Sequence, residues 1–365
     1  MKKLHLVLIG LMACLASGIS TARGQVGYSL TDLGVVKDMQ TSEVFAINQW
    51  GHVAGTGYNG SESCAFHYFN KFMEDAGGVN SRGFGISSTN MVVGDAVFGP
   101  AMDPRSHAAT FSGGVAKDLG VLNGQVYSRA NGANATGQVV GYSGLQRDSS
   151  QSHAFLWTYQ TGMIDLGTLG GAYAQANAIN EAGFITGTAD TWNMFVTTHA
   201  FIYQPARPYK PQMRDLGVLG GLSSYGMAIN GNNHVAGYST LQANSGQVHA
   251  FLHNGNSMID LGSLGAKGTN SDVSVALGVN KSDQVVGYSY LPGAPGMPLQ
   301  QVAFLWRPNV GQMVDLNTLL YGLGRNYRLI SATAINDDGQ IVANAVDIQT
   351  GGLRAVLLTP TPPAP

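Results

Sequence analysis

The sequence predicts an all-β protein, a seven-bladed β-propeller with four antiparallel strands in each blade. Three observations lead to this prediction: a unit of short strand signals that returns seven times, turn residues at a fixed place in each unit, and an offset between the chain ends that closes a ring. The chain has 365 residues and 50 glycines, about twice the usual share of roughly 7%. Repeat architectures place such a length in one domain.

Three short signatures define the unit, and each occurs seven times. An Asp-Leu-Gly-like strand end has its acidic residue at Asp32, Asp75, Asp118, Asp165, Asp215, Asp260 and Asp315. An Ala-Ile-Asn-like segment ends at Asn48, Ser87, Asn134, Asn180, Asn230, Asn280 and Asn336. A His-Ala-Phe-like segment has its alanine at Ala65, Ala108, Ala154, Ala200, Ala250, Ala303 and Ala355. Successive aspartates are 43 to 55 residues apart, the length of one four-stranded unit.

Each unit contains four short strand signals separated by turns. Three residues after the Asn position stand Gly51, Asn90, Gly137, Gly183, Asn233, Asp283 and Gly339. These residue types tolerate a left-handed backbone best, so we expect a tight hairpin there in every unit. A strand such as 138–143 follows, then a variable polar loop, the His-Ala-Phe strand and the Asp-Leu-Gly strand. Their β-branched and aromatic residues are typical of strands.

The first strand of each unit is rich in small residues. The residues two and four places before the Asn position are Ala46, Gly85, Gly132, Ala178, Ala228, Gly278 and Ala334, and Val44, Gly83, Ala130, Ala176, Gly226, Ala276 and Ala332. With alternating side chains, these positions predict one small face, and the other face holds isoleucines such as Ile47 and Ile179. A strand that crowds against its own copies around an axis needs such a face.

The two ends of the chain indicate a ring. The chain opens with an isolated Asp-Leu-Gly strand at 28–34 and closes with a His-Ala-Phe strand at 354–358 that lacks its partner. We expect the first strand to complete the last blade, because this arrangement removes an exposed sheet edge. A parallel β-helix would have a shorter period and separate caps.

Units three to five carry the fullest copies of the signatures, such as His153-Ala154-Phe155-Leu156-Trp157, Met163-Ile164-Asp165-Leu166-Gly167 and Ala178-Ile179-Asn180. In these residues the chain resembles the bacterial extracellular repeat family named for its His-Ala-Phe (HAF) signature. The resemblance extends over the mature chain, although Cys64, Val302 and Arg354 replace the histidine in other units. It implies export from a bacterial cell and no settled activity.

The N-terminus predicts export. Residues 1–24 read as a signal peptide, with basic Lys2 and Lys3, an apolar run from Leu4 to Ala16 and small residues after it. The propeller is expected over 25–359, followed by a proline-rich tail at 360–365. A secreted or periplasmic protein follows, with lipid anchoring through Cys14 as the alternative. No later stretch reads as a membrane span.

The composition and motifs exclude several classes of function. With 11% charged residues and a net charge of −2, the chain has no electrostatic footprint for nucleic acid. It contains no nucleophile elbow, zinc-protease helix, Walker loop, Cys-x-x-Cys or calcium loop. We therefore assign no catalytic residue, metal or cofactor. The repeated histidines and aspartates receive a structural role, because equivalent positions in a ring lie a blade width, roughly 10 Å or more, apart.

Candidate binding residues lie where the repeat is irregular. Five places before the Asn position, near the expected channel mouth, stand Glu43, Arg82, Arg129, Gln175 and Tyr225, with Val275 and Ser331 in the last two blades. The loops between second and third strands are irregular as well, and one contains Asp190 and Trp192. Arginine, aromatic and amide groups at a concave mouth suit an anionic or sugar ligand.

These observations favour a monomeric, non-enzymatic binding or scaffold module for a carbohydrate or for an extracellular or envelope protein. The alternative is a polysaccharide hydrolase or lyase with its site at the channel mouth, and a purely structural envelope protein is a third reading. Replacing Arg82 and Arg129 together is expected to abolish binding with little change in stability.

Overall fold

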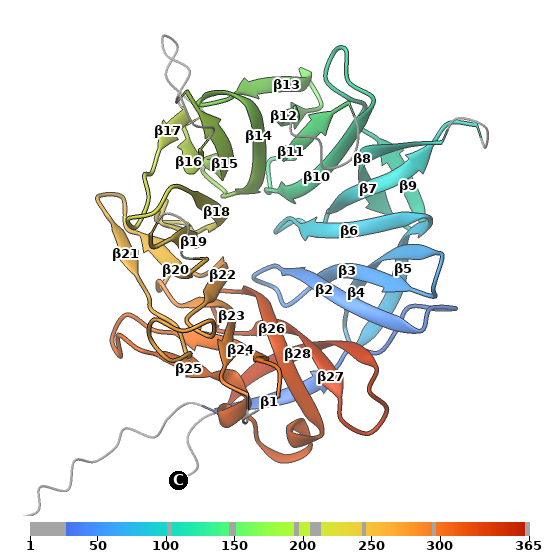
Figure 1. The fold of residues 1–365 in the computed structure, drawn as a ribbon. Helices are drawn as coiled ribbons and strands as arrows, with labels where there is room; N and C mark the ends of the chain where they lie inside the picture. The colour runs from blue at the N-terminus through green and yellow to red at the C-terminus, as the bar shows by residue number, and fades with distance from the viewer. Residues whose placement is uncertain are drawn as a thin grey trace, which may run out of the picture.

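The computed structural model describes residues 27–100, 104–145, 151–192, 197–204, 213–242, 246–293 and 297–361. They form seven four-stranded antiparallel sheets arranged as blades around an axis (Figure 1). The predicted all-β seven-bladed propeller is confirmed. The expected signal peptide, Cys14 and residues 362–365 lie outside the described residues. Within the described ranges, no helix is long and apolar enough to cross a membrane.

The strands follow the chain from the axis outward in each blade. Blade 1 consists of β2 (Thr41–Ile47), β3 (Val53–Tyr58), β4 (Ser63–Phe69) and β5 (Phe72–Val79). Blade 2 consists of β6 (Ser81–Ile86), β7 (Val92–Phe98), β8 (Arg105–Ser112) and β9 (Val115–Asp118). Blade 3 consists of β10 (Tyr127–Ala133), β11 (Val139–Gly144), β12 (His153–Thr158) and β13 (Gly162–Gly167). Blade 4 consists of β14 (Gly170–Ile179), β15 (Ile185–Thr191), β16 (Thr198–Tyr203) and β17 (Met213–Asp215). Blade 5 consists of β18 (Ser224–Ile229), β19 (Val235–Thr240), β20 (Val248–His253) and β21 (Met258–Asp260). Blade 6 consists of β22 (Ser274–Val279), β23 (Val285–Leu291), β24 (Gln300–Trp306) and β25 (Met313–Asp315).

Blade 7 joins the two ends of the chain. It holds β26 (Tyr327–Ile335), β27 (Ile341–Asp347), β28 (Leu353–Thr361) and, as its outermost strand, β1 (Gly27–Asp32). β1 pairs with β28 from Gly27 opposite Thr361 to Asp32 opposite Val356, so the predicted closure is confirmed. β28 therefore runs two residues past the expected propeller end at 359. Two 3₁₀-helices, η1 (Leu316–Leu319) and η2 (Gly322–Asn326), connect blade 6 to this blade.

The hairpin between the first and second strands has the expected left-handed residue in every blade. All seven residues at the third place after the Asn position have positive φ, between 59° and 82°: Gly51, Asn90, Gly137, Gly183, Asn233, Asp283 and Gly339. We call the end of the ring that carries these hairpins the turn face. The opposite end, where loops join second to third strands, is the loop face.

On the turn face, asparagine side chains link each blade to the next. In six blades the amide Nδ2 donates to a backbone carbonyl at the Asn position of the following blade, at 2.9–3.2 Å. The last of these bonds runs from Asn336 to the carbonyl of Asn48 and so closes the circle. Ser87 occupies the Asn position in the remaining blade. This belt of buried amides, named here the amide belt, explains why the unit ends in asparagine.

Each innermost strand has a β-bulge three places before the Asn position, and this bulge corrects the expectation of one small face. In β6, for example, Gly83 pairs with Gly94 and Gly85 pairs with Val93, with Phe84 extra between them. Because their partners Gly94 and Val93 are adjacent in β7, Gly83 and Gly85 lie on opposite faces of the sheet. A Cβ on Gly83 would meet the carbonyl of Gly55 in the preceding blade, and one on Gly85 would meet Asn131 in the following blade. Both faces are therefore small.

The bulge also accounts for a glycine in the second strand of six blades. A Cβ added at Gly141 would lie 1.9 Å from the carbonyl oxygen of Arg129, and equivalent contacts of 1.8–2.2 Å occur at Gly55, Gly94, Gly187, Gly237 and Gly287. Blade 7 has Ala343 at this place, and its first strand shows a second irregularity between Leu329 and Ser331. The glycine thus permits the close approach of the bulged strand.

The repeated histidines and aspartates hold the outer strands of a blade together, as expected. His107, His153, His199 and His249 each place Nδ1 2.7–2.9 Å from the aspartate of the same blade. The same aspartate accepts the N–H of the glycine two residues later, as Asp165 does from Gly167 at 2.7 Å. Cys64 stands at the histidine position of blade 1 and is 3% exposed. Burial, with Asp75 nearby, raises the pKa of its thiol to about 12, consistent with an inert packing role.

Candidate functional site

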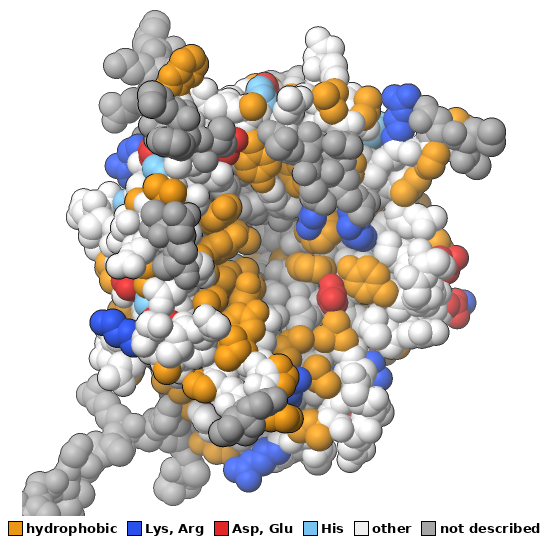
Figure 2. Space-filling view, viewed as in Figure 1, with side chains coloured by type: hydrophobic (Ala, Val, Ile, Leu, Met, Phe, Trp, Pro, Cys, Tyr) orange, Lys and Arg blue, Asp and Glu red, His pale blue; other side chains and the backbone are white. Residues whose placement is uncertain are grey.

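The axial channel contains a cavity of about 430 Å³ that opens toward the loop face. Figure 2 looks onto this face and shows a central hollow with hydrophobic side chains around it and charged side chains at one side. The cavity is lined by Phe45, Phe84, Arg129, Asn131, Gln175, Asn177, Met227, Leu277, Tyr288, Gln301, Ser331, Thr333 and Asn344. Its volume lies in the range of small-ligand sites.

A ring of bulged residues forms the floor of this cavity. The extra residue of each innermost strand lines both this cavity and a smaller one, of about 210 Å³, nearer the turn face: Phe45, Phe84, Asn131, Asn177, Met227, Leu277 and Thr333. We call this ring the waist. A bulge re-aims a side chain, and here it turns one residue per blade toward the axis. Blades 1 and 2 supply two aromatic rings in edge contact, with centroids 5.0 Å apart.

Arg82 is engaged in an ion pair with Asp95. Its Nε donates to Asp95 Oδ1 at 2.9 Å, and its Nη2 contacts Asp95 Oδ2. Asp95 is 1% exposed and also accepts bonds from Ser106 and Tyr127. Burial alone would lower the pKa of Arg82, but its bonds to Asp95 raise it. The pair forms one wall of a smaller pocket of about 280 Å³ between blades 1 and 2.

Arg129, one blade further on, has no such partner. Its guanidinium lies over the ring of Phe84, 3.4 Å from the centroid. Its Nε is buried and has no hydrogen-bond partner in the part of the chain that the structure describes. Arg129 lines the main cavity, where among the described lining residues there is no carboxylate. The two arginines therefore differ: one is neutralised within the fold, and the other faces the cavity with its charge unmatched.

Tyrosines of blades 3 to 6 form a belt around the loop-face side of the channel. Tyr225 and Tyr238 are stacked with centroids 4.6 Å apart, and the Tyr127 and Tyr142 rings lie 5.8 Å apart. Tyr288, which lines the cavity, meets Tyr290 edge-on at 6.0 Å. Burial raises the pKa of Tyr127, Tyr173, Tyr238 and Tyr288. These phenols are accordingly neutral at physiological pH. Tyr127 is buried, with its hydroxyl on Asp95, whereas Tyr288 lines the cavity.

The structure distributes the other sequence-predicted residues around this site. Gln175 lines the main cavity, where its Oε1 accepts the hydroxyl of Tyr173 at 2.8 Å. Glu43 is half-buried, and although a bond from Tyr58 opposes the effect, burial raises the pKa of its carboxyl. Asp190 is 8% exposed and accepts Thr198 Oγ1, whereas Trp192 is 86% exposed at the end of β15. Neither of these two lines the cavity.

Sequence reasoning missed the waist and most of the tyrosine belt. The waist residues stand three places before the Asn position, between the two small positions, and their variation from Phe to Asn to Met marks them as unconstrained by the repeat. Tyr142, Tyr238 and Tyr288 share a Gly-Tyr-Ser sequence in the second strand. That recurring tyrosine beside the innermost strand was a readable signal.

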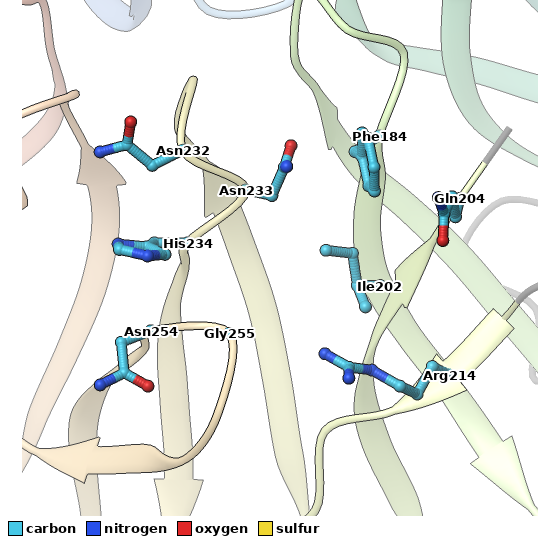
Figure 3. Close-up of a pocket in the computed structure, with 9 residues that line it drawn as sticks. All are labelled: Phe184, Ile202, Gln204, Arg214, Asn232, Asn233, His234, Asn254 and Gly255. Atoms are coloured by element: carbon cyan, nitrogen blue, oxygen red, sulfur yellow. The ribbon is translucent and has the colours of Figure 1, made fainter. Parts of the chain in front are cut away.

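A separate pocket of about 340 Å³ lies on the turn face between blades 4 and 5. Figure 3 shows Arg214 reaching into it from the blade 4 side, beside Ile202, whereas His234 and Asn254 point away from it. His234 instead bonds Asp283 of blade 6 at 2.8 Å. Within the described ranges, no three His, Cys, Asp or Glu side chains are grouped so as to hold a metal ion.

Comparisons with known proteins support the fold and leave the chemistry open. A family model described as "Protein of unknown function (DUF3466)" matches residues 220–352. No curated protein matches the chain. The β-propeller domain of the Trilobed protease from Pyrococcus furiosus, described as revealing an open velcro topology, superposes with a TM-score of 0.55 at 9% identity, covering 88% of this chain and 94% of that one.

Two peptidase structures are also similar over part of their length. A puromycin-hydrolyzing peptidase from Mycobacterium tuberculosis has a TM-score of 0.48 at 13% identity, with 84% of this chain and 50% of that chain covered. An acylaminoacyl peptidase from Pyrococcus horikoshii has a TM-score of 0.47 at 9% identity, with 85% and 50% covered. At such low identities, similarity to solved structures bears on the fold alone. The seven sheets and the likeness to the Trilobed protease propeller make the chain a seven-bladed β-propeller, and its stretch 220–352 is similar to a family of unknown function.

Proposed function

We propose that this protein is an exported, non-enzymatic binding module that holds a carbohydrate in the axial cavity of its loop face. The observation that carries the proposal is the cavity of about 430 Å³ in which one arginine is stacked on an aromatic ring without an acidic partner. Aromatic faces with a few oriented polar groups are the usual lining of a small-molecule site.

The lining fits a sugar better than an apolar ligand. Asn131 and Asn177 each donate Nδ2 to a carbonyl of the next blade, at 2.9 and 2.7 Å. Their amide oxygens have no partner among the described residues and remain as acceptors for hydroxyl groups. Phe45, Phe84 and Tyr288 offer ring faces for the C–H faces of a sugar. The cavity therefore combines acceptors, a cation and aromatic surfaces.

The lining also bears on the choice between binding and hydrolysis. Glycosidases use two carboxyl groups about 5 to 10 Å apart across the scissile bond. The described lining of the cavity contains none. Of the acidic side chains named above, Asp95 is bonded by Arg82, Asp190 by Thr198 and Glu43 by Tyr58. This favours binding without turnover.

The test is binding of the purified mature protein to an oligosaccharide array, with the same samples analysed by chromatography for shortened or unsaturated products. We expect binding without products, and loss of binding in Tyr288→Ala, whose side chain lines the cavity, but not in Tyr159→Ala, whose ring is 80% exposed. Product formation would replace the proposal by the hydrolase or lyase reading. Absence of both binding and products would remove the carbohydrate from it.

A further inference from the structure

We infer that the ligand enters the channel end-on and that Arg129 binds a carboxylate on its terminal unit, an acidic sugar at the end of a glycan chain. This inference rests on the proposed function and makes it specific in two respects: the charge of the bound unit and the direction of entry.

The charge follows from the state of Arg129. Stacking on Phe84 at 3.4 Å fixes the guanidinium plane at the cavity wall, and the buried Nε lacks a partner among the described residues. A buried, unmatched donor on a cation is costly. A carboxylate meets a guanidinium with two parallel hydrogen bonds and neutralises its charge. Because Nε is buried, the terminal nitrogens of Arg129 are the donors that an oxygen anion in the cavity would meet.

Among the described residues that line the cavity, none supplies this anion. Arg82 lies in the same place one blade earlier, and there the fold supplies the carboxylate of Asp95 as its counter-charge. The second-strand residue opposite Arg129 is Tyr142, which is neutral. Thus the cross-strand position that supplies a carboxylate in blade 2 supplies a phenol in blade 3.

End-on entry follows from the waist. The seven bulged side chains divide the channel into the cavity of about 430 Å³ and the inner one of about 210 Å³. On the turn face, Glu181 of blade 4 reaches across to Ser88 of blade 2 at 2.7 Å and to the N–H of Ala135 at 2.9 Å. In the inferred mode, a chain end enters from the loop face and meets the waist beside Arg129.

The acceptors at the waist favour a sugar over a peptide C-terminus, which would bring a carboxylate of the same charge. The oxygens of Asn131 and Asn177 lie in side chains whose nitrogens are already committed. They can accept donors from the ligand, and the ring hydroxyls of a sugar supply several close to its carboxylate. Further units of the glycan then meet the stacked Tyr225 and Tyr238 on the way out.

The test measures calorimetric affinities for three oligosaccharides of one length: uronate-terminated, neutral, and with the uronate internal under a neutral end. We expect the uronate-terminated compound to bind tighter than either of the others by on the order of tenfold or more, and less tightly as salt rises. Arg129→Gln should remove this preference and Arg129→Lys should restore part of it. Arg214→Gln, which removes a cation from the turn-face pocket, should leave all three affinities unchanged.

The contrary outcomes are separable. Equal binding of the neutral compound would overturn the carboxylate while leaving the proposed function in place. Equal binding of the internally charged compound would overturn end-on entry. Binding of peptides with a free C-terminus, and of no oligosaccharide, would overturn the sugar and the proposed function with it. A preference that survives in Arg129→Gln would show that another residue reads the charge.

Discussion

The two rims of the channel are built from the same seven strands in opposite ways. On the turn face, an asparagine recurs in six blades and donates to the corresponding carbonyl of the next blade, up to the bond from Asn336 to Asn48. On the loop face, the equivalent strand positions hold Glu43, Arg82, Arg129, Gln175, Tyr225, Val275 and Ser331. The same asparagine and the same backbone carbonyl recur in neighbouring blades. The asparagine amides of the turn face therefore find their acceptors in the next blade.

The loop face has no such repetition, and its polar groups are satisfied one at a time. Arg82 meets Asp95 across the strand pair, whereas Arg129 at the next place meets Tyr142. The lesson is that in this ring the regular rim provides closure and the irregular rim provides unmatched groups. Substitutions at either rim can test that division.

Arg82→Ala should destabilise the protein by about 3–5 kcal/mol, because it leaves the carboxylate of Asp95 buried and without its cation. Arg129→Ala should cost no more than about 1 kcal/mol, the value of an exposed cation–π contact. The free energy of unfolding from urea titrations measures both. Replacing Arg82 and Arg129 together should therefore lower the stability, contrary to the expectation from the sequence. Arg129 alone is the residue to replace in a binding test.

The outcome that contradicts this contrast is equal destabilisation by the two changes. The double variant Arg82→Ala, Asp95→Ala serves as the control, since removing both charges should recover most of the stability that Arg82→Ala loses.

Gly141→Ala should destabilise the protein by about 1–3 kcal/mol through overpacking. The new Cβ would lie 1.9 Å from the carbonyl oxygen of Arg129, so the bulge has to move, and ligand affinity should fall with it. Gly231→Ala is the matched control, because nothing lies within 4 Å of a Cβ there. It should be neutral or slightly stabilising. Equal melting temperatures for the two variants would show that the bulge does not need its glycine.

Asn180→Ala should cost about 1–3 kcal/mol, because it removes one link of the amide belt and leaves the carbonyl of Asn230 and the N–H of Phe184 without that partner. Ser87→Asn places an amide at the one position where the belt is interrupted, and should add about 0.5–1.5 kcal/mol. Thermal unfolding of both variants checks the pair. A Ser87→Asn protein less stable than wild type would mean that the gap is required by its surroundings.

Sequence reasoning predicted the ring and its closure but only part of the site, and one assumption explains the difference. The spacing of Asp, Asn and Ala gave the correct number of blades, because this spacing does not depend on local register. Strict alternation was assumed in addition along the first strand. It failed between Gly83 and Gly85, where a bulge places the two residues on opposite faces and turns Phe84 toward the axis. The floor of the cavity consists of such bulged residues.

The two arginines could not be told apart from the sequence. Arg82 and Arg129 occupy the same place in adjacent units, and their difference depends on the cross-strand residues Asp95 and Tyr142. Asp95 lies in β7, opposite Arg82. Pairing register decides which charge is neutralised, and register becomes visible only once the strands are aligned.

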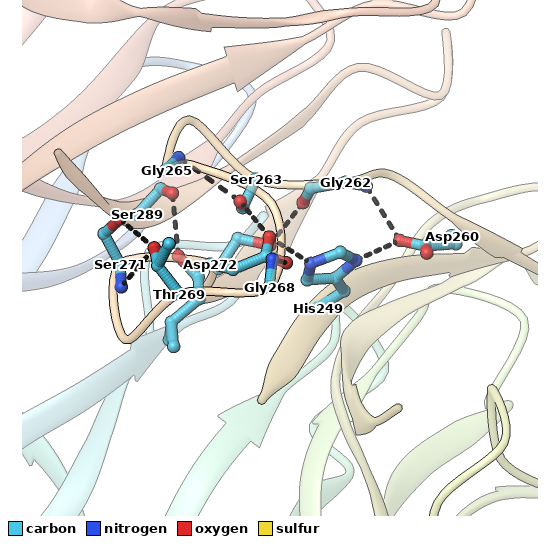
Figure 4. A network of polar contacts seen from close by, with 12 residues as sticks. His249, Asp260, Gly262, Ser263, Gly265, Gly268, Thr269, Ser271, Asp272 and Ser289 are labelled. Atoms are coloured by element: carbon cyan, nitrogen blue, oxygen red, sulfur yellow. Dashed lines mark hydrogen bonds and ion pairs between the residues drawn. The ribbon is translucent and has the colours of Figure 1, made fainter. Parts of the chain in front are cut away.

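The smallest expected effect concerns pH and again contrasts a repeated group with a departure from the repeat. His249 has the usual bond from Nδ1 to its blade aspartate, Asp260, and a second from Nε2 to Asp272, both at 2.8 Å (Figure 4). Burial alone would lower the pKa of His249, but the two carboxylates raise it above 6.5. The pKa values of Asp260 and Asp272 are lowered, because their bonds, including those to His249, outweigh burial.

The sign of the pH dependence follows from these directions. A histidine whose folded pKa is raised contributes stability that is complete below the unfolded value of about 6.5 and is lost as pH rises through the folded value. The lowered carboxyl pKa values contribute stability above about pH 3.9 that is lost at lower pH. The cluster should therefore stabilise the protein most between about pH 4 and 6.5.

Asp272→Asn tests this cluster, because it removes one of the two negative charges that contact His249 and keeps the size of the side chain at position 272. The melting temperature of the variant should lie furthest below that of wild type near pH 5.5, and the gap should narrow as pH rises through the folded pKa of His249. A gap of constant size would show that Asp272 acts only through its neutral bonds, those from Gly268 and Ser263. In that case Asp272 would stabilise its own loop and not the charged form of His249. His249 would then have the same structural role as the other repeated histidines.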